Sequence, residues 1–396
     1  MAAPAAILSC AFLSAPVAAR VIAVAPGPDA QARLQEALID ARPGDTVTLG
    51  AGRFELTDGL SLDVDRVELR GAGPDRTVLS FKGQQGAGEG LLVTSDDVVL
   101  RDFAVEDTRG DGIKSKGADR IVYHNLRVEW TGGPKATNGA YGVYPVSSSD
   151  ILVDKVVVRG ASDAGIYVGQ SRNIVVRGSI AEYNVAGIEI ENSYNADVHG
   201  NVARHNTGGI LVFDLPNLPQ TGGHSVRVFA NQITDNDTPN FAPAGNIVAS
   251  VPTGTGVMVM ANARVHVFGN TLAGNGTTNV LLVGYREAFD DKAYNPLIRE
   301  VVVRDNVHGR AGYAPAFPGG AELAAAMGGT LPPIVWDGTG ERVVARDKVT
   351  ALTLALSDPR QPLTAARPAP ARFPDGALPG EPAPVVLPAG MAERIR

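Results

Sequence analysis

The residues of this sequence with the greatest capacity for chemistry are two glutamates separated by one residue, Glu189 and Glu191. They lie in the segment V-A-G-I-E-I-E-N, in which apolar and polar residues alternate as they do in a β-strand. Side chains two residues apart on a strand point to the same face, about 6.8 Å apart at the backbone. Such a pair can act as acid and base across a glycosidic bond, or can bind calcium through its oxygens.

Further polar and aromatic residues are expected on the same face of the predicted sheet. Tyr167 precedes Glu189 by 22 residues (189−167) and could act as the base of a β-elimination. We therefore predict that Glu189, Glu191 and Tyr167 are catalytic, and that the substrate-binding residues are Lys114, Lys116, Tyr144, Asn192 and Asp214. We expect the two glutamates to be exposed, so that their replacement by glutamine leaves the melting temperature nearly unchanged. The alternative is that they form a solvated strand face with no role in chemistry.

The strand that carries the glutamates is one of a series. The glycines of D-A-G-I-Y-V-G-Q, V-A-G-I-E-I-E-N and T-G-G-I-L-V-F-D are Gly165, Gly187 and Gly209, which stand 22 residues apart (187−165 and 209−187). A fixed period of this length marks a repeat architecture, and 22 residues leave room for short strands but not for a helix. Asp163, just before the first of these glycines, fits the role of a turn former as well as that of a ligand.

A second strand is expected to start nine residues after each repeat glycine, at Ile121, Ile151, Ile174, Ala196 and Val265. Residues at equal offsets then form ladders between stacked coils. Asn184 and Asn206 form one expected ladder, because asparagine tolerates tight corners and its amide can bond to the copy above. The pattern predicts an all-β solenoid in which each repeat is one coil.

Irregular spacing shows where loops interrupt the coils. Excess residues fall at 131–139, 215–223 and 235–252. Long loops on a regular scaffold are frequent places for binding sites. We predict a groove over Glu189, Glu191 and Tyr167 between these loops, and we expect the last insert or the C-terminal tail to cover the apolar residues that continue the strip, Leu211, Phe213, Met258 and Met260.

The two ends of the solenoid require caps, because a bare coil would expose the core and unpaired strand edges. A helix is predicted over residues 29–41, with Asp29 as its N-cap and an apolar face formed by Leu34, Ala37, Leu38 and Ala41. After Val303 the period fades, with a short helix predicted near residues 321–327 and an extended Pro- and Ala-rich segment over 363–387. We assign residues 20–310 to the β-helix domain and 311–396 to an extension that packs on it.

The apolar, Ala-rich residues 1–19 are predicted to be a signal peptide, which places the mature protein in the periplasm or outside the cell. A buried first strand is one alternative, and a lipoprotein anchor at Cys10, the only cysteine, is another. The net charge of −7 and the absence of a basic run argue against a nucleic-acid partner. We expect a monomer that does not span a membrane.

The segment A-R-P-G-D-T-V-T-L-G-A-G-R-F-E-L, residues 41–56, resembles the opening of proteins in the pectin-lyase-like superfamily. The phrases G-A-S-D-A-G-I-Y-V-G-Q-S and G-I-E-I-E-N-S resemble a bacterial family of parallel β-helix repeat proteins of unassigned function. This resemblance implies a right-handed, single-stranded parallel β-helix. Superfamily members with known activity are mostly polysaccharide lyases, uronate epimerases and glycoside hydrolases.

The resemblance assigns no catalytic residue, because the sequence has neither the D-P-H-D motif of mannuronan epimerases nor a pectate-lyase-like cluster of calcium-binding aspartates. Three hypotheses follow. The first is a secreted carbohydrate-active enzyme, similar to a lyase, an epimerase or a glycosidase, that acts on a polysaccharide or oligosaccharide. The others are a non-catalytic carbohydrate-binding protein and a structural protein of the cell envelope. No cofactor is required by the pattern, and calcium is the ion that the glutamate pair could bind.

Overall fold

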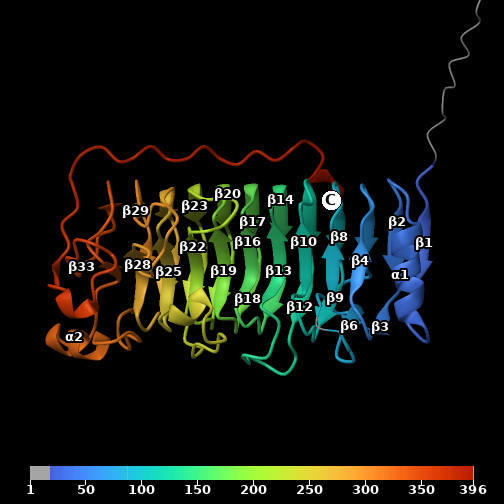
Figure 1. Ribbon diagram of the computed structural model, residues 1–396, viewed down its shortest axis with the longest axis horizontal. Coiled ribbons are helices and arrows are strands. Elements are labelled where there is room, and N and C mark those ends of the chain that lie inside the picture. The colour runs from blue at the N-terminus through green and yellow to red at the C-terminus, as the bar shows by residue number, and fades with distance from the viewer. Residues whose placement is uncertain (1–17, 87, 396) are drawn as a thin grey trace, which may run out of the picture.

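The computed structural model describes residues 18–86 and 88–395, which form one elongated parallel β-helix (Figure 1). Most coils contribute one strand to each of three sheets of 12, 12 and 10 strands, and the strands of successive coils pair in parallel. The signal peptide predicted over residues 1–19 lies almost entirely outside the described residues. No helix in the described chain is long and apolar enough to cross a membrane.

The glycine sheet contains the strands that carry the repeat glycines. Its strands are β4 (Leu60–Leu62), β7 (Leu91–Val93), β10 (Ile113–Lys116), β13 (Tyr141–Val146), β16 (Ala164–Gly169), β19 (Ala186–Glu191), β22 (Gly208–Phe213), β25 (Thr255–Met260), β28 (Thr278–Val283), β31 (Ile334–Trp336), β33 (Ala351–Thr353) and the antiparallel β34 (Ala369–Pro370).

The second sheet follows the glycine sheet in each coil. Its strands are β1 (Val21–Val24), β2 (Thr46–Leu49), β5 (Glu68–Arg70), β8 (Val99–Arg101), β11 (Ile121–His124), β14 (Ser149–Asp154), β17 (Arg172–Arg177), β20 (Tyr194–His199), β23 (His224–Phe229), β26 (Ala263–Phe268), β29 (Val302–Arg304) and β32 (Val344–Ala345).

The third sheet completes each coil with short strands. They are β3 (Gly52–Glu55), β6 (Thr77–Ser80), β9 (Ala104–Glu106), β12 (Arg127–Glu129), β15 (Val157–Arg159), β18 (Ile180–Glu182), β21 (Val202–Arg204), β24 (Gln232–Thr234), β27 (Thr271–Ala273) and β30 (Val307–His308).

The register confirms the predicted repeat. Ile166 pairs with Ile188 and Ile188 with Ile210, so the repeat glycines stack directly on one another. A Cβ atom added to Gly187 would lie 2.5 Å from the carbonyl oxygen of Gly209. Only glycine fits at this inside corner, which explains why the motif recurs with the period of the coil.

The corners next to these glycines are closed by asparagine ladders. The backbone N–H of Asn184 donates to Oδ1 of Asn206 at 3.0 Å, and the ladder continues through Asn236 and Asn275. The first step confirms the predicted ladder. A second ladder, through Asn201, Asn231, Asn270 and Asn306, was not predicted. Both supply partners to corner N–H groups that the sheets leave unpaired.

The N-terminal end is closed by α1 (Ala30–Asp40), which confirms the predicted capping helix. Its Leu34 and Leu38 are fully buried against the first coils. The prediction that Asp29 caps the helix through its side chain is wrong, because no such hydrogen bond forms. Asp29 has a left-handed backbone (φ 57°), whereas a capping side chain reaches the first helical N–H groups from an extended backbone.

The coils continue beyond the predicted domain boundary at residue 310. Strands β31, β32 and β33 extend the ladders of the glycine and second sheets to Thr353. The boundary was placed too early because segments 284–298 and 309–333 interrupt the 22-residue spacing. The second of these contains α2 (Gly320–Ala326), the predicted short helix. Three 3₁₀ turns, η1 (Ile247–Ser250), η2 (Leu363–Ala365) and η3 (Glu393–Ile395), complete the described elements.

The C-terminal tail runs back along the length of the solenoid (Figure 1). It packs on the outer face of the second sheet, where Met391 contacts a row of buried side chains, Val99, Val122, Leu152 and Val175. Glu381 forms ion pairs with Arg227 and Arg304 at 3.0 and 2.6 Å. The expectation that this segment is extended and lies on the solenoid is confirmed.

Candidate active site

The predicted catalytic residues lie side by side on the outward face of the glycine sheet. Tyr167 pairs with Glu189, and Gly169 pairs with Glu191 one coil further on. The expectation that these side chains are exposed is wrong, because Glu189 is 1% exposed, Glu191 6% and Tyr167 4%. The inserts do not merely flank this face but fold over it. This outward face of the glycine sheet is therefore buried, and it opens to solvent only where the inserts leave a gap.

Tyr167 and Glu191 form the central hydrogen bond of the layer. The phenol of Tyr167 donates to Oε1 of Glu191 at 2.8 Å. The tyrosine ring lies over Gly169, where an added Cβ atom would be 2.3 Å from the tyrosine oxygen. Gly169 has an ordinary backbone conformation, so it is needed here for space and not for flexibility. The hydrogen bond holds Glu191 in one orientation.

A third carboxyl group, Asp163, joins the two glutamates from the corner just before β16. It is 5% exposed, and its Oδ2 accepts a hydrogen bond from Nδ2 of Asn246 at 3.2 Å. Asn246 belongs to the 235–252 insert, so this contact joins the insert to the sheet. The sequence placed Asp163 beside a repeat glycine but could not separate a turn former from a functional carboxyl.

All three carboxyl groups have raised pKa values, and burial is the largest cause for each. Burial, followed by the charge of Glu191, raises the pKa of Asp163 to about 7. Burial also raises the pKa of Glu191, although the hydrogen bond from Tyr167 opposes this shift. The pKa of Glu189 is raised well above its usual value by burial and then by the charges of Asp163 and Glu191. Like charges in a dry site cannot all ionise, so the cluster retains protons near neutral pH.

Glu189 lies deepest in the cluster. Its Oε2 is buried without a hydrogen-bond partner among the described residues. A buried carboxyl in this state is strongly favoured in its neutral form. Glu189 therefore lies beneath the pocket and does not line it, while Asp163 and Glu191 face the open part of the site.

Three tyrosines form one wall of the site. The rings of Tyr141 and Tyr144 lie 4.5 Å apart, Tyr141 lies 4.5 Å from Tyr167, and Tyr144 meets Tyr167 edge-on at 4.9 Å. Tyr144 was predicted on this face, whereas Tyr141 was missed because strict alternation would place it on the same side as the inward Val143. Aromatic rings with polar tips suit the apolar faces and hydroxyl groups of sugars.

The predicted lysines lie at the far end of the strip. Lys114 Nζ pairs with Glu89 at 2.9 Å and with Asp111 at 3.6 Å, and it lies 4.9 Å from the ring centroid of Tyr144. Two carboxylates already neutralise this lysine, which does not support the prediction that it binds a substrate carboxylate. Lys116 is exposed at the end of β10.

Asn192 and Asp214 were predicted to bind substrate, but the structure shows them holding the 215–223 insert. Oδ1 of Asn192 accepts the N–H of Leu215 at 2.8 Å, and its amide donates to the carbonyls of Leu215 and Gln220. Asp214 accepts the N–H groups of Gly222 and Gly223. Both side chains are almost completely buried, and their hydrogen bonds hold this loop in place; that they bind substrate stays a prediction.

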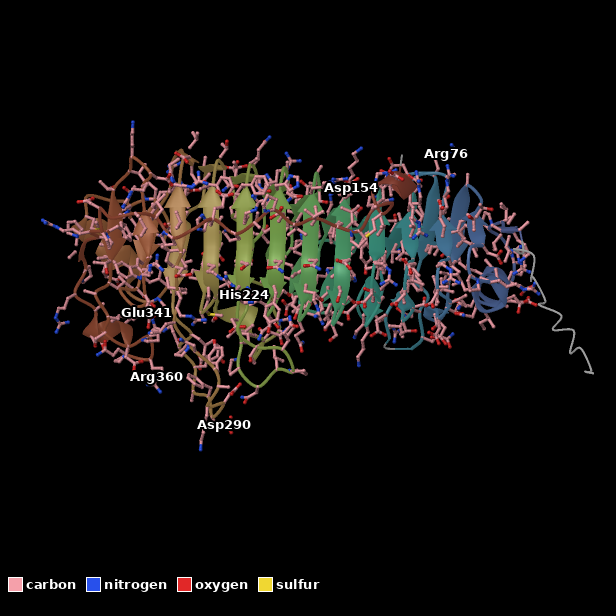
Figure 2. The ribbon with its side chains drawn as sticks, turned by 90° about the horizontal axis from the view of Figure 1, so that it is seen from above. Arg76, Asp154, His224, Asp290, Glu341 and Arg360 are labelled. Carbon is pink, nitrogen blue, oxygen red and sulfur yellow. The ribbon has the colours of Figure 1, made fainter. Side chains whose placement is uncertain are left out.

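The site opens in a pocket of about 410 Å³ between the inserts. Asp163, Glu191 and Tyr141 line its sheet side. The opposite side is formed by residues 215–218, Asn246, Ile247, Tyr285 and Ala288. The last two belong to the loop that follows β28, which was not predicted; Figure 2 shows Asp290 at its outer end, away from the strands. We call this space the acid pocket.

A calcium site at Glu189 and Glu191 is not supported by the arrangement of these residues. Within residues 18–86 and 88–395 there is no cluster of three or more potential metal ligands in suitable positions. Glu189 is shut off from solvent, and Glu191 already accepts a hydrogen bond from Tyr167. Calcium is usually bound by about six to eight oxygen ligands.

Comparison with known proteins identifies the fold. Residues 89–241 match a family model described as a right handed beta helix region. The A-module of mannuronan C-5 epimerase AlgE4 from Azotobacter vinelandii is 16% identical, with 81% of this chain and 91% of that chain covered and a TM-score of 0.55. DFA-IIIase from Arthrobacter chlorophenolicus A6, without its lid and in complex with GF2, is 11% identical, with 86% and 96% covered and a TM-score of 0.52. No curated protein matches the sequence.

These likenesses establish a right-handed parallel β-helix, as predicted from the sequence. At such low identity they show the fold alone. Any chemistry must be argued from the acid pocket itself.

Proposed function

We propose that this right-handed parallel β-helix protein is a carbohydrate-active enzyme that hydrolyses a glycosidic bond in the acid pocket. The observation that carries the proposal is the convergence of Asp163 and Glu191, two carboxyl groups with raised pKa values, on one pocket beside a tyrosine wall. Glycosidases use a pair of carboxyl groups in this way, one protonated and one ionised.

Asp163 and Glu191 lie in different environments, and this difference indicates a different catalytic role for each. The pKa of Asp163, about 7, keeps it protonated at moderate pH, which suits a general acid that protonates the leaving oxygen. Glu191 accepts the hydrogen bond from Tyr167, which favours its ionised form. It is then the group that activates water or attacks the sugar carbon. Tyr167 and Glu189 are positioning residues, and the acid–base pair is Asp163 with Glu191, not Glu189 with Glu191.

A neutral glycan is the substrate class that the charges favour. Lyases and epimerases must neutralise a uronate carboxylate before they remove the adjacent proton. The residues that line the acid pocket include two acids but no lysine, arginine or histidine. Burial also raises the pKa of Tyr167 well above its usual value, which makes it a poor base. These features weigh against the lyase and epimerase forms of the carbohydrate-active hypothesis.

The named structural neighbours support a sugar substrate, since one is a mannuronan epimerase and the other was solved in complex with GF2. We further propose that the protein acts alone as a monomer, outside the cytoplasm, without nucleic acid and without a metal cofactor. The apolar segment 1–19 supports the location.

A second candidate is a binding protein without chemistry. The tyrosine wall favours it, because aromatic rings bind sugars whether or not a bond is cleaved. The two candidates differ in the need for ionisable carboxyl groups, so a single assay separates them.

The test is to incubate the purified protein with neutral and uronate polysaccharides and to measure new reducing ends together with the absorbance of unsaturated ends. We expect reducing ends from a neutral glycan, and a fall in kcat of about 100-fold or more in Glu191→Gln and Asp163→Asn. Glu36→Gln, an exposed glutamate on α1, is the matched control. Cleavage that survives both substitutions would defeat the assignment, and sugar binding without cleavage would establish the second candidate.

A further inference from the structure

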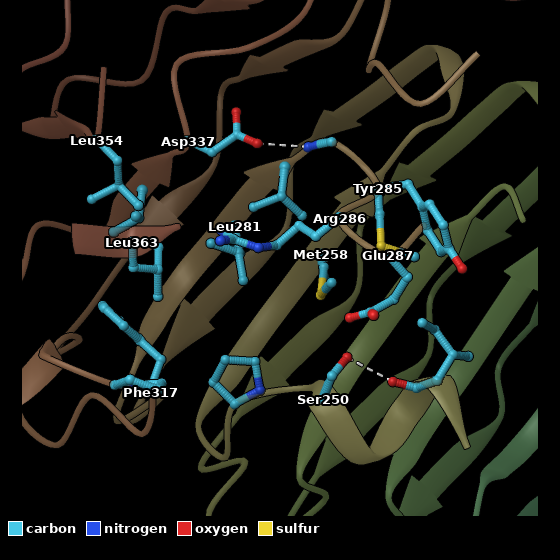
Figure 3. Close-up of a pocket in the computed structure, with 17 residues that line it drawn as sticks. Ser250, Met258, Leu281, Tyr285, Arg286, Glu287, Phe317, Asp337, Leu354 and Leu363 are labelled. Atoms are coloured by element: carbon cyan, nitrogen blue, oxygen red, sulfur yellow. Dashed lines mark hydrogen bonds between the residues drawn. The ribbon is translucent and has the colours of Figure 1, made fainter. Parts of the chain in front are cut away.

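A second pocket, of about 260 Å³, lies on the same outward face of the glycine sheet, towards the C-terminal end of the solenoid (Figure 3). Met258, Met260 and Leu281 line it from β25 and β28. Phe317, Leu354 and Leu363 line it from later segments of the chain. We call it the apolar pocket. The 235–252 insert covers part of the predicted apolar patch, as expected, since Val248 and Val251 belong to the same cluster. The cover is incomplete, and the apolar pocket is what remains open.

The apolar pocket adjoins the acid pocket. Ile247 from the 235–252 insert and Tyr285 from the loop after β28 line both spaces. A molecule bound with its reacting bond at Asp163 and Glu191 can therefore extend over this shared wall without leaving the protein surface. The two pockets are thus neighbours that share one wall.

The charged groups around the apolar pocket favour a neutral occupant. Asp337 is 1% exposed and accepts hydrogen bonds from the N–H groups of Gly284 and Thr339, so it serves the fold. Arg286 donates to the carbonyl of Gln361 at 2.9 Å, and the exposed Glu287 brings a residue of opposite charge to the same lining. The rest of the lining consists mainly of aliphatic, thioether and aromatic side chains, as in pockets that take apolar groups.

We propose that the apolar pocket is a second subsite, which holds a neutral apolar substituent, an acyl or aryl group, carried by the sugar substrate of the acid pocket. This inference rests on the proposed function, because it identifies the substrate as a glycan that carries such a group. A concave surface lined mainly by apolar side chains is typical of sites that bind apolar groups. Because the two pockets share a wall, one substrate molecule can reach both, and its apolar substituent is the proposed occupant of the apolar pocket.

The first arm of the test measures binding of the substituent alone. 1-Hexanol and benzyl alcohol are titrated into the full chain, with saturation-transfer NMR as the readout. Burial of a hexyl chain predicts a Kd on the order of 1 mM, with 1-propanol at least about tenfold weaker. Met258→Trp fills the pocket and Leu363→Glu places a charge at its edge, so each should weaken binding about tenfold or more. Glu191→Gln should bind both alcohols like the wild type.

The second arm uses the cleavage assay. 1-Hexanol should act as a competitive inhibitor that raises KM for the cleaved glycan in the wild type, and this inhibition should be lost in Leu363→Glu, which avoids repacking the sheet. Melting temperatures confirm that each variant is folded. Absence of saturable hexanol binding in the folded wild type, or unchanged binding in both pocket variants, overturns the inference and leaves the proposed function intact. Hexanol binding without any glycan cleavage instead refutes the proposed function and, with it, the assignment as a substrate subsite.

Discussion

At the scale of single residues, the pleat of a strand determines which side chains leave the core, and this was predictable. Ile188 and Ile190 point inward, and Glu189 and Glu191 point outward, as the alternation in the sequence indicates. Their burial was not predictable, because it depends on how three loops from other coils fold over them. The glutamates are consequently buried acids with raised pKa values and not solvated charges.

The hydrogen bond from Tyr167 should set the acidic limb of the pH profile. The bond lowers the pKa of Glu191 against the effect of burial. Since Glu191 must be ionised, removing the phenol in Tyr167→Phe should move the acidic limb of kcat/KM to higher pH by about one unit. Tyr144→Phe, which removes a phenol from the same wall, is the control and should leave the limb in place. An unchanged profile in Tyr167→Phe would show that Glu191 is not the ionised partner.

Asp163 should make stability depend on pH with an unusual sign. Its pKa is about 7 in the folded protein and 3.8 as the reference value, so the folded state binds more protons between these values. Stability therefore falls as pH rises through this window. Asp163→Asn cannot ionise at this position, so its stability should not fall in this way. The difference in free energy of unfolding, variant minus wild type, should therefore rise by on the order of 2 kcal/mol from about pH 4 to about pH 8. Denaturant titration of Asp163→Asn and of the wild type at both pH values measures this change.

A difference between Asp163→Asn and wild type that is constant with pH would mean that Asp163 ionises normally in the folded protein. Glu36→Gln should show no trend in the same titrations, because this glutamate is exposed on α1.

At the scale of elements, the spacing of the glycines located two of the loops that build the site, the 215–223 and 235–252 inserts, whereas the predicted 131–139 insert does not line the acid pocket. It missed the loop after β28, because no further repeat glycine follows β28 from which an excess could be counted. The glycine spacing also could not show that the side chains of Asn192 and Asp214 hold the 215–223 loop in place. That use depends on the path of the 215–223 backbone, which local sequence patterns do not specify.

Asn192 provides the test of this positioning role. Asn192→Ala removes one hydrogen bond accepted from Leu215 and two donated to the loop carbonyls. We expect a loss of about 1–3 kcal/mol in stability, typical of unpaired buried polar groups. KM should rise more than kcat falls, because the loop lines the acid pocket without touching the reacting bond. Equal loss of kcat and kcat/KM would instead indicate direct participation of Asn192 in the transition state.

At the scale of the whole molecule, the period and the capping signals predicted the solenoid and the helix α1 that closes its first coil. The C-terminal tail had no period, so its course could only be expected to follow the solenoid. The structure shows that it joins the last coils to the first, with Glu381 paired to Arg227 and Arg304, and Arg394 donating to the carbonyl of Asp97.

Removal of residues 371–396 should lower stability without changing the chemistry. It exposes the row of Val99, Val122, Leu152 and Val175 on the second sheet, and each buried aliphatic side chain contributes about 1.5–3 kcal/mol at most. We expect a lower melting temperature and unchanged kcat at low temperature, because the acid pocket is on the glycine sheet. Met391→Asp should reproduce part of the effect in the full chain. An unaltered melting temperature in the truncated protein would contradict a stabilising role for the tail.

The central claim, hydrolysis by Asp163 and Glu191, is tested most directly by cleaving the glycan in water enriched in heavy oxygen and analysing the products by mass spectrometry. Hydrolysis adds one water oxygen for each bond that is cleaved, so the account predicts heavy oxygen in the saturated products of the wild type. Glu191→Gln should form these products about 100-fold or more slowly. Unsaturated products without heavy oxygen would contradict the account, because they would show that the bond is broken by elimination.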